Sequence, residues 1–271
     1  MLSVGALRAH LLAARLAGPI ATLREKSLRS YRLFAAGDPR QMLGLDPERA
    51  WTVGELLRLM AERCGVSPDP AHTSGHDVID PDRTVAALDA FADRIRSAAD
   101  HREPVLLGTG HPQRLHGFYA ALAGALSAAG CPVLTPSHGR CIDMPTQFGL
   151  RRHYLRYVGG VAVVCATPTI APGREPGVHT HSPLPVRAAL AGAGGRGRRL
   201  PRLVVGDHGW VCGAGQLGIE AIGLADSDDP AVFVAQAEGR MSVVVPLDDA
   251  VRSDYYRPLT RYVLNRACLS Q

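Results

Sequence analysis

The chain has 271 residues, which is long enough for one large hydrophobic core or for two small domains. Its composition is that of a soluble globular protein, with 46% hydrophobic and 20% charged residues, and no uninterrupted apolar run reaches the roughly 18 residues of a membrane span. The net charge of +5 suits an anionic ligand, but aromatic residues make up only 5% of the chain and no basic stripe is interleaved with them, which argues against nucleic-acid binding.

The N-terminal segment predicts a folded first helix. Its apolar run is interrupted by Arg8, His10 and Arg15, which argues against a signal peptide. The six cysteines of the chain form no CxxC pair and match no zinc motif, so no disulfide framework is implied. Both observations lead us to expect a cytoplasmic protein.

The first hundred residues are mostly helical in pattern. A periodic run predicts a helix that ends near Cys64-Gly65, and a second run after Asp82 predicts another helix with one apolar face. Residues 66–82 lie between them and are rich in Pro, Gly, His and Asp, which is typical of a loop that can lie over a site. We expect residues 1–100 to form a helical N-terminal region that packs on the core.

Short apolar runs alternate with helical patterns from Pro104 onwards. The expected strands are 104–110, 131–136, 159–166, 201–207, 221–226 and 241–247, and the expected helices are 113–130, 183–192, 213–221, 230–239 and 255–267. Strands that alternate with helices favour βαβ units, and strands that are apolar on both faces favour a buried parallel sheet. The prediction is an α/β protein with a parallel, doubly wound, Rossmann-like sheet over residues 101–271, which carries the site.

Polar side chains follow nearly every expected strand. In chain order they are the Gly108–His111 turn, His138, His179 and His181, Asp207 and His208, Asp226 and Asp228, and Asp248 and Asp249. Because the carboxyl ends of parallel strands meet at one edge of the sheet, we expect these groups to rim one crevice. Carboxylates suit a hard cation such as Mg²⁺, whereas imidazoles suit Mn²⁺ or Zn²⁺ or act as acids and bases.

Helix capping is the alternative explanation of the aspartates. Asp207 can cap the helix that follows it, and Asp226 and Asp228 can cap a helix that begins near Asp229-Pro230. Capping explains one carboxylate well and three poorly. His179 and His181 alternate, so they face the same way on an extended segment and can chelate a metal; two exposed loop histidines are the alternative. The candidate ligands of a divalent metal, Mg²⁺ or Mn²⁺, are thus Asp207, Asp226, Asp228, His179 and His181.

Glycine-rich turns supply the remaining candidates. The Gly108–His111 turn can hold a phosphate through backbone amides at a helix N-terminus, although a tight turn needs glycine in any case. Residues 213–218 match GxGxxG but begin too far after the strand for a dinucleotide site, so close helix packing is the better interpretation. The candidate substrate-binding residues are Gly108, Thr109, Gly110, His138, Gly213 and Gly215, and the candidate catalytic residues are Asp207, His208 and His111.

Three segments, 108–122, 177–190 and 204–239, resemble an actinobacterial family of predicted phosphatases, and the resemblance runs nearly end to end. It implies an enzyme that hydrolyses phosphoric monoesters. More distantly, an aspartate at one strand end followed by a helix and a second polar strand end is similar to the metal-dependent damage-control phosphatases. That similarity implies Asp207 as a metal ligand with Asp226 or Asp228, although this chain has Asp207-His208 where that family has Asp-Asn.

Together these features predict a metal-assisted phosphatase that acts on a small phosphorylated metabolite, with His208 or His111 as general acid or base. Two alternatives stay open: a non-catalytic nucleotide- or anion-binding module, and an NAD(P)-dependent oxidoreductase. We expect no nucleic-acid or membrane partner; the oligomeric state is open, with a homo-oligomer among the alternatives. The most specific expectation is geometric, since Asp207, His208, Asp226 and His111 should lie within one pocket.

Overall fold

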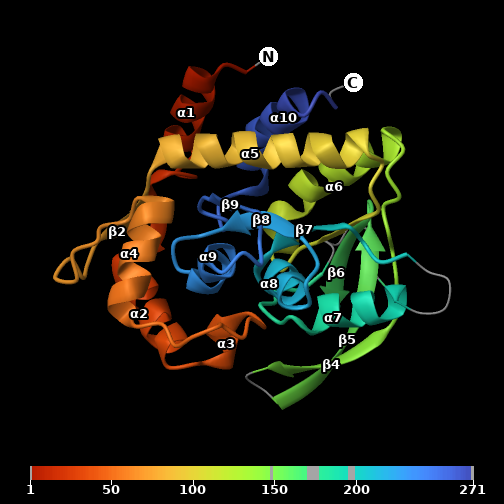
Figure 1. The fold of residues 1–271 in the computed structure, drawn as a ribbon, viewed down its shortest axis with the longest axis horizontal. Helices are drawn as coiled ribbons and strands as arrows, with labels where there is room; N and C mark the ends of the chain where they lie inside the picture. Colours follow the sequence, from red (N-terminus) through yellow and green to blue (C-terminus); the bar gives the residue numbers. More distant parts are fainter. Residues whose placement is uncertain (1, 147–148, 170–176, 195–198, 270–271) are drawn as a thin grey trace.

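A seven-stranded sheet lies at the centre of the computed structural model, which describes residues 2–146, 149–169, 177–194 and 199–269 (Figure 1). The strand order is β4-β5-β6-β3-β7-β8-β9. The strands are β3 (Val105–Gly108), β4 (Cys141–Thr146), β5 (Gly149–Val158), β6 (Val161–Cys165), β7 (Leu203–Asp207), β8 (Ala221–Ala225) and β9 (Val243–Pro246). Strands β6, β3, β7, β8 and β9 are parallel, while β4 and β5 are antiparallel, so the predicted α/β class with a mostly parallel sheet is confirmed.

The chain changes direction within the sheet at β3. After β3 it forms β4, β5 and β6 on one side, and then it crosses to β7 on the other side of β3. The connections on either side of such a point separate, which leaves a crevice outside the carboxyl ends of the two strands. The turns after β3 and β7 therefore lie side by side at the carboxyl edge of the sheet, where this topology places a crevice.

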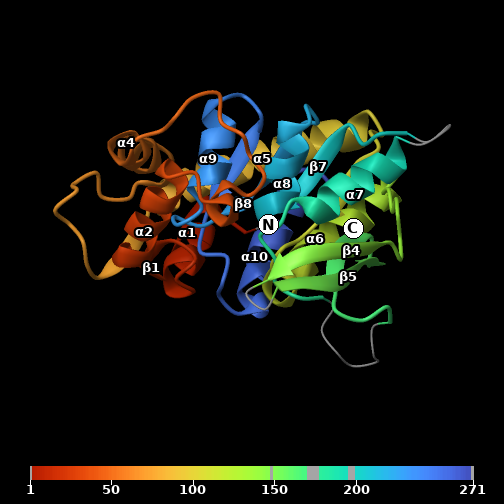
Figure 2. The ribbon, with the colours of Figure 1, turned by 90° about the horizontal axis from the view of Figure 1, so that it is seen from below.

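The helices pack in two groups. α5 (Pro81–Asp100), α6 (Pro112–Ala128) and α10 (Arg257–Arg266) contact one another, and Figures 1 and 2 show α10 beside α6. α7 (Leu184–Ala193), α8 (His208–Gln216) and α9 (Pro230–Ala237) form a row in which α8 contacts both neighbours. The four adjacent strands β6, β3, β7 and β8 are fully buried, because neighbouring strands flank their edges and helices cover the faces of the sheet.

The N-terminal region combines helices with a small ribbon. The helices are α1 (Val4–Ala13), α2 (Arg24–Ala35), α3 (Pro39–Met42), α4 (Val53–Cys64) and α5. α4 ends as predicted, because Gly65 adopts a left-handed conformation with a φ of 83° that favours glycine. Strands β1 (Gly18–Leu23) and β2 (His76–Ile79) pair antiparallel, and the local pattern did not predict them because each depends on a partner far along the chain.

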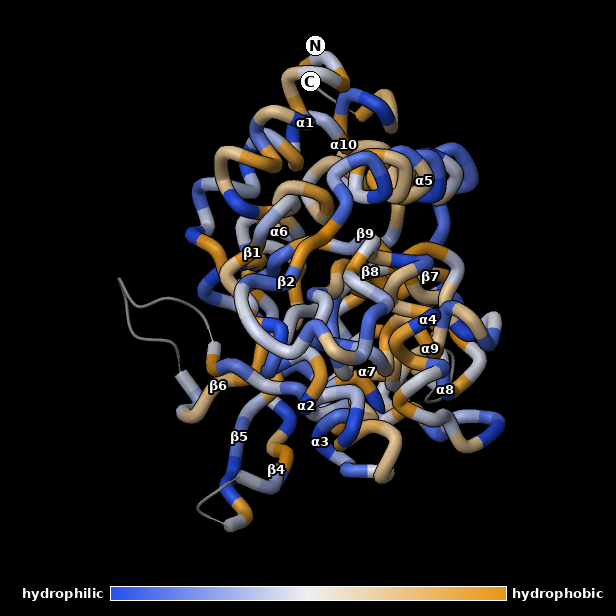
Figure 3. Tube along the Cα trace, turned by 90° about the vertical axis from the view of Figure 1, so that its left-hand side faces the viewer, coloured by the Kyte–Doolittle hydropathy of each residue, from blue (hydrophilic) through white to orange (hydrophobic). Residues whose placement is uncertain are grey.

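Two predictions for the core were wrong, and one pair of strands was not predicted. Residues 131–136 form no strand and contribute only a single bridge from Val133 to Val105, since a proline near each end of the segment removes a backbone donor. The helix expected at 213–221 begins earlier, at His208, directly after β7. The β4–β5 hairpin was not expected, because its arginines mask a strand with only one covered face; Figure 3 shows hydrophilic β5 projecting with β4 at the bottom of the view.

The C-terminal helix expected at 255–267 is present as the short helix η1 (Ser253–Tyr256) followed by α10. Within the described ranges, no helix has both the length and the apolar character needed to cross a membrane.

Candidate functional site

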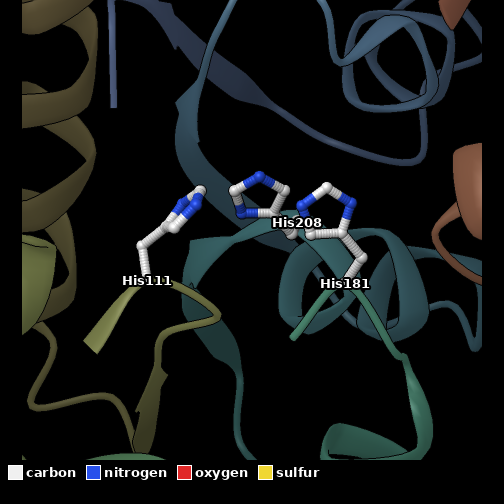
Figure 4. A group of neighbouring side chains, drawn as sticks. All are labelled: His111, His181 and His208. Atoms are coloured by element: carbon white, nitrogen blue, oxygen red, sulfur yellow. The ribbon is translucent and has the colours of Figure 1, made fainter. Parts of the chain in front are cut away.

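Four histidines meet in the crevice at the carboxyl ends of β3, β6 and β7, and we call them the histidine cluster: His111, His179, His181 and His208. Figure 4 shows the rings of three of them, with His208 between His111 and His181. The ring centroids of His208 lie 4.4 Å from those of His111 and His181, and His179 stacks on His111 at 4.2 Å. Burial, followed by the charges of neighbouring imidazoles, lowers the pKa of His179 to about 4 and that of His181 to about 3.

Backbone contacts bring the segments of this cluster together. The segment after β6 continues beside the sheet, where the Val178 amide donates to Val164 O at 2.7 Å and the Thr180 amide donates to Gly110 O at 2.9 Å. His179 and His181 therefore flank a residue that is tied to the turn after β3. The alternation of the two histidines thus places both rings beside His111.

His208 sits at a strained turn between β7 and α8. Its φ of 47° lies in the left-handed region, which costs a non-glycine residue energy and persists only where the surroundings require it. A Cβ at Gly209 would lie 2.4 Å from His181 O, and a Cβ at Gly206 would lie 2.3 Å from Gly108 O. The two glycines thus allow the close approach of three segments around His208.

Asp207 has both carboxylate oxygens occupied by donors from the protein. Oδ1 accepts from the Gly110 amide at 2.6 Å and lies 2.9 Å from His208 Nδ1, and Oδ2 accepts from Thr109 Oγ1 at 2.6 Å. Burial opposes the charge on Asp207, but His208, His111 and Thr109 outweigh it, so its pKa is lowered. A proton on His208 Nδ1 directs Nε2 away from Asp207, as in carboxylate–histidine pairs of metal sites.

The backbone amides of the turn after β3 already donate hydrogen bonds to other groups of the protein. The Thr109 amide donates to Ala162 O at 3.1 Å, the Gly110 amide donates to Asp207, and the His111 amide donates to Thr109 Oγ1 at 3.0 Å. These donors are not available to a ligand. The physical basis for a phosphate held by the Gly108–His111 turn is therefore absent.

Asp229 and Asp249 face the histidine cluster from the ends of β8 and β9. His208 Nε2 lies 3.2 Å from Asp229 Oδ2 and 3.5 Å from Asp249 Oδ2, and His111 Nδ1 lies 3.3 Å from Asp249 Oδ2. Burial disfavours a charged His208, but the carboxylates of Asp229, Asp207 and Asp249 outweigh burial and raise its pKa. Asp249 Oδ2 and His111 Nδ1 are buried and have no hydrogen-bond partner among the described residues.

The atoms in this part of the crevice have the spacing of a metal site. In each of two groups of three side chains, the possible ligand atoms all lie within 4.8 Å of one another. The groups are His111, His181 and His208, and His208, Asp229 and Asp249. Buried polar atoms without partners are rare in folded proteins and point to a missing water or ion.

Three further carboxylates lie beside these groups, and we call them the aspartate cluster: Asp226, Asp228 and Asp248. Asp226 accepts from Thr22 Oγ1 at 2.5 Å and from the Ser227 amide at 2.6 Å, and Lys26 Nζ lies 2.9 Å from Asp228 Oδ2. Burial, reinforced by the neighbouring carboxylates, raises the pKa of Asp226 well above its usual range and that of Asp228 to about 6. The N-terminal ribbon and α2 thus complete this cluster.

The structure separates some of the predicted residues from the rest. Asp207, His208 and His111 lie together, and Asp226 lies in the adjoining aspartate cluster. His138 is exposed, and its Nε2 lies 3.0 Å from an Arg156 nitrogen, outside the histidine cluster.

Two of the glycines of α8, Gly213 and Gly215, serve packing. A Cβ at Gly213 would lie 2.7 Å from Val186 Cγ1, and a Cβ at Gly215 would lie 2.4 Å from Arg240 O. Both glycines are buried, which leaves no room for a ligand against this part of α8. The helix-packing interpretation of the GxGxxG motif therefore describes what these residues do.

Sequence reasoning did not select Asp229, Asp249, Thr22 or Lys26. Asp229 directly precedes Pro230, where a helix was expected to begin, and its side chain makes no capping hydrogen bond. The signals available were that Asp249 follows a strand end and that Lys26 is the only lysine of the chain.

Two comparisons with known proteins cover the whole site. The model of a family described as "Phosphatase" matches residues 2–271. The protein named Phosphatase SCO2771, from Streptomyces coelicolor, is 43% identical over 265 residues, which cover 96% of this chain and 94% of that protein. Both similarities include the N-terminal ribbon as well as the strand ends that carry the two clusters.

Proposed function

This chain belongs to the phosphatase family, and we propose that it is a metal-assisted phosphatase that hydrolyses a small phosphorylated metabolite. One observation carries the metal in this proposal. His208 Nε2, Asp229 Oδ2 and Asp249 Oδ2 converge in a buried space, and Asp249 Oδ2 has no hydrogen-bond partner among the described residues. Two carboxylates that converge on one imidazole nitrogen favour a positive charge between them, and a bound cation would take the place of the proton on His208 Nε2.

The donor set fits a divalent cation. Ligand atoms that lie about 2.1 Å from a tetrahedral ion are separated by about 3.4 Å. Three of the separations here are 3.2 to 3.5 Å, and the possible ligand atoms of each group lie within 4.8 Å of one another. Mixed imidazole and carboxylate donors suit Mn²⁺ or Zn²⁺ better than Mg²⁺, which prefers oxygen ligands. We therefore propose Mn²⁺ or Zn²⁺, held by His208, Asp229, Asp249 and His111, with His181 available as a further ligand.

Asp207 has a different proposed role from the one expected from the sequence. Because its oxygens are saturated by Thr109, Gly110 and His208, it positions the His208 ring instead of binding the cation. The cation itself, when bound, would polarise the phosphoryl group and lower the pKa of a bound water.

Two further side chains have proposed roles, one in proton transfer and one in substrate binding. His179 is the exposed member of the histidine cluster, so it is the imidazole that a substrate can reach, and its stacking on His111 holds the ring in place. Because its pKa is lowered to about 4, the His179 imidazole is neutral near pH 7, and we assign it the acceptance of a proton from water. Lys26 is exposed beside the aspartate cluster and offers a positive charge to phosphoryl oxygens.

A covalent phosphohistidine at His208 is a less favourable mechanism. The strained turn between β7 and α8 resembles the strand-to-helix turns that present nucleophiles. The Nε2 atom, however, faces Asp229 and Asp249 at 3.2 and 3.5 Å, and these carboxylates would repel a phosphate dianion. For the non-catalytic and NAD(P)-dependent alternatives, the packing role of Gly213 and Gly215 removes the glycine contact on which both relied.

Metal removal and replacement test this proposal. The protein is treated with a chelator, and phosphate release from p-nitrophenyl phosphate and a metabolite panel is measured before and after addition of Mn²⁺, Zn²⁺ or Mg²⁺. We expect the chelated protein to be inactive and Mn²⁺ or Zn²⁺ to restore activity better than Mg²⁺. Full activity of a protein shown by elemental analysis to be free of metal would overturn the proposal.

A further inference from the structure

A cavity of about 450 Å³ lies between the first half of α6 and the segment formed by η1 and α10. Phe118 and Tyr256 are buried and form its floor, and the side chains of Arg114, Arg257 and Arg261 stand around it. His116 and Gln113 complete the α6 wall, and no aspartate or glutamate is among the described residues that line it. The volume is within the range of small-ligand sites.

The three arginines of this cavity carry uncompensated charge. Arg114, Arg257 and Arg261 are exposed, and within the described part of the chain their guanidinium groups make no ion pair or hydrogen bond. The acid nearest in sequence, Asp254, pairs with Arg252 at 3.0 Å instead. Three like charges around one hollow repel each other, and an anion between them relieves that repulsion. Guanidinium groups bind phosphate and carboxylate through paired donors.

Residues that line the cavity are linked to the candidate active site on two sides. Arg114 follows His111 by three residues on α6, which is about 4.5 Å along the helix axis. Gln113 Nε2 donates to Gly177 O at 2.7 Å, next to the segment that carries His179. On the other wall, Tyr256 donates its hydroxyl hydrogen to Asp248 O at 2.8 Å. These links connect the cavity to the histidine cluster and to the aspartate cluster through short stretches of chain and one side chain.

We propose that this cavity binds a second anionic group of the substrate, a phosphate or a carboxylate. The substrate class is then a small metabolite with one phosphate that is hydrolysed and another anionic group that is only held. This inference rests on the proposed phosphatase function. A second anionic group also explains why the positive charges of the cavity are separate from the carboxylates of the site, because those carboxylates would repel an anion.

Kinetics with two sugars that differ by one phosphate test the inference. We compare glucose 1,6-bisphosphate, glucose 6-phosphate and p-nitrophenyl phosphate in the natural protein and in the double variant Arg257→Gln/Arg261→Gln. Removing these charges should lower kcat/KM for the bisphosphate about tenfold or more, mainly through KM, because the lost contacts hold a group that does not react. Phosphate release from p-nitrophenyl phosphate should change less than about twofold. The matched control is Arg58→Gln, an exposed arginine on α4 outside the cavity.

A binding measurement separates this inference from the proposed function. In an Asp249→Asn background, calorimetric affinity for glucose 1,6-bisphosphate should fall about tenfold when the two arginines are replaced. If no ester is hydrolysed but this affinity still depends on the arginines, the phosphatase proposal fails and the anion site stands. If the double variant treats all three substrates as the natural protein does, or loses activity on all three by the same factor, the inference is overturned. Replacement of Arg114 by Gln should reproduce the selective loss if the double variant does not fold.

Discussion

The two clusters of the crevice are built from the same kinds of ionisable side chain but differ in how their polar atoms are satisfied. In the aspartate cluster every carboxylate accepts a hydrogen bond from the protein or pairs with a cation of the protein. Thr22, Lys26 and the Ala21 amide are among these partners. Around the histidine cluster, Asp249 Oδ2 and His111 Nδ1 are buried without a partner among the described residues. The comparison teaches that charge alone does not mark a metal site, because carboxylates that already have partners from the protein need a cation less than a buried oxygen without one.

The largest expected effect is at Asp249. Asp249→Asn keeps the size of the side chain but removes the charge that faces both His111 and His208. We expect bound metal to be lost and phosphatase activity to fall at least about 100-fold, because loss of a direct ligand should exceed the 10- to 100-fold effect of outer contacts. Elemental analysis and phosphate release measure this. Asp143→Asn on the exposed β4–β5 hairpin is the control, and unchanged metal content in Asp249→Asn would place the cation elsewhere.

A smaller effect is expected at Asp207, which positions His208 in our account. Asp207→Asn removes the negative charge that lies 2.9 Å from His208 Nδ1 and replaces one of the two acceptor oxygens by a donor. It should lower metal affinity and activity about 10- to 100-fold, without abolishing either. Titration with Mn²⁺ should restore part of the activity at high metal concentration. Loss of activity that no metal concentration restores would assign Asp207 a direct role in catalysis.

The α/β class could be predicted because each parallel strand is a short apolar run that needs no distant information. The strand ends with polar residues could also be found, since they follow those runs directly. The choice between Asp226 and Asp249 as a ligand could not be predicted, because it depends on which carboxylate receives donors from Thr22 on β1. The β1–β2 ribbon that supplies Thr22 joins residues far apart in sequence, such as Gly18 and Ile79.

A substitution in the aspartate cluster should lower the stability of the protein and leave its metal content unchanged. Thr22→Val removes the hydroxyl that donates to buried Asp226, which leaves one carboxylate oxygen without that donor. We expect the free energy of unfolding to fall by about 1–3 kcal/mol, measured by urea denaturation of the chelated protein. Thr167→Val, at an exposed position, is the control. Loss of bound metal in Thr22→Val would show that the two clusters act as one site.

The smallest effect is expected at His138, the histidine that the sequence placed at the site and the structure places elsewhere. His138→Ala removes an exposed side chain that contacts Arg156 and Tyr157. Activity and metal content should stay within about twofold of the natural protein, because exposed substitutions away from a site have small effects. A tenfold loss of activity would mean that His138 reaches the substrate.

Anomalous diffraction from crystals grown with Mn²⁺ tests the central claim most directly, because it locates the cation relative to both clusters. We predict an anomalous peak within coordination distance of His208 Nε2, Asp229 and Asp249. A peak at Asp226, Asp228 and Asp248 with none beside His208, or no peak in either cluster at saturating Mn²⁺, would contradict the account.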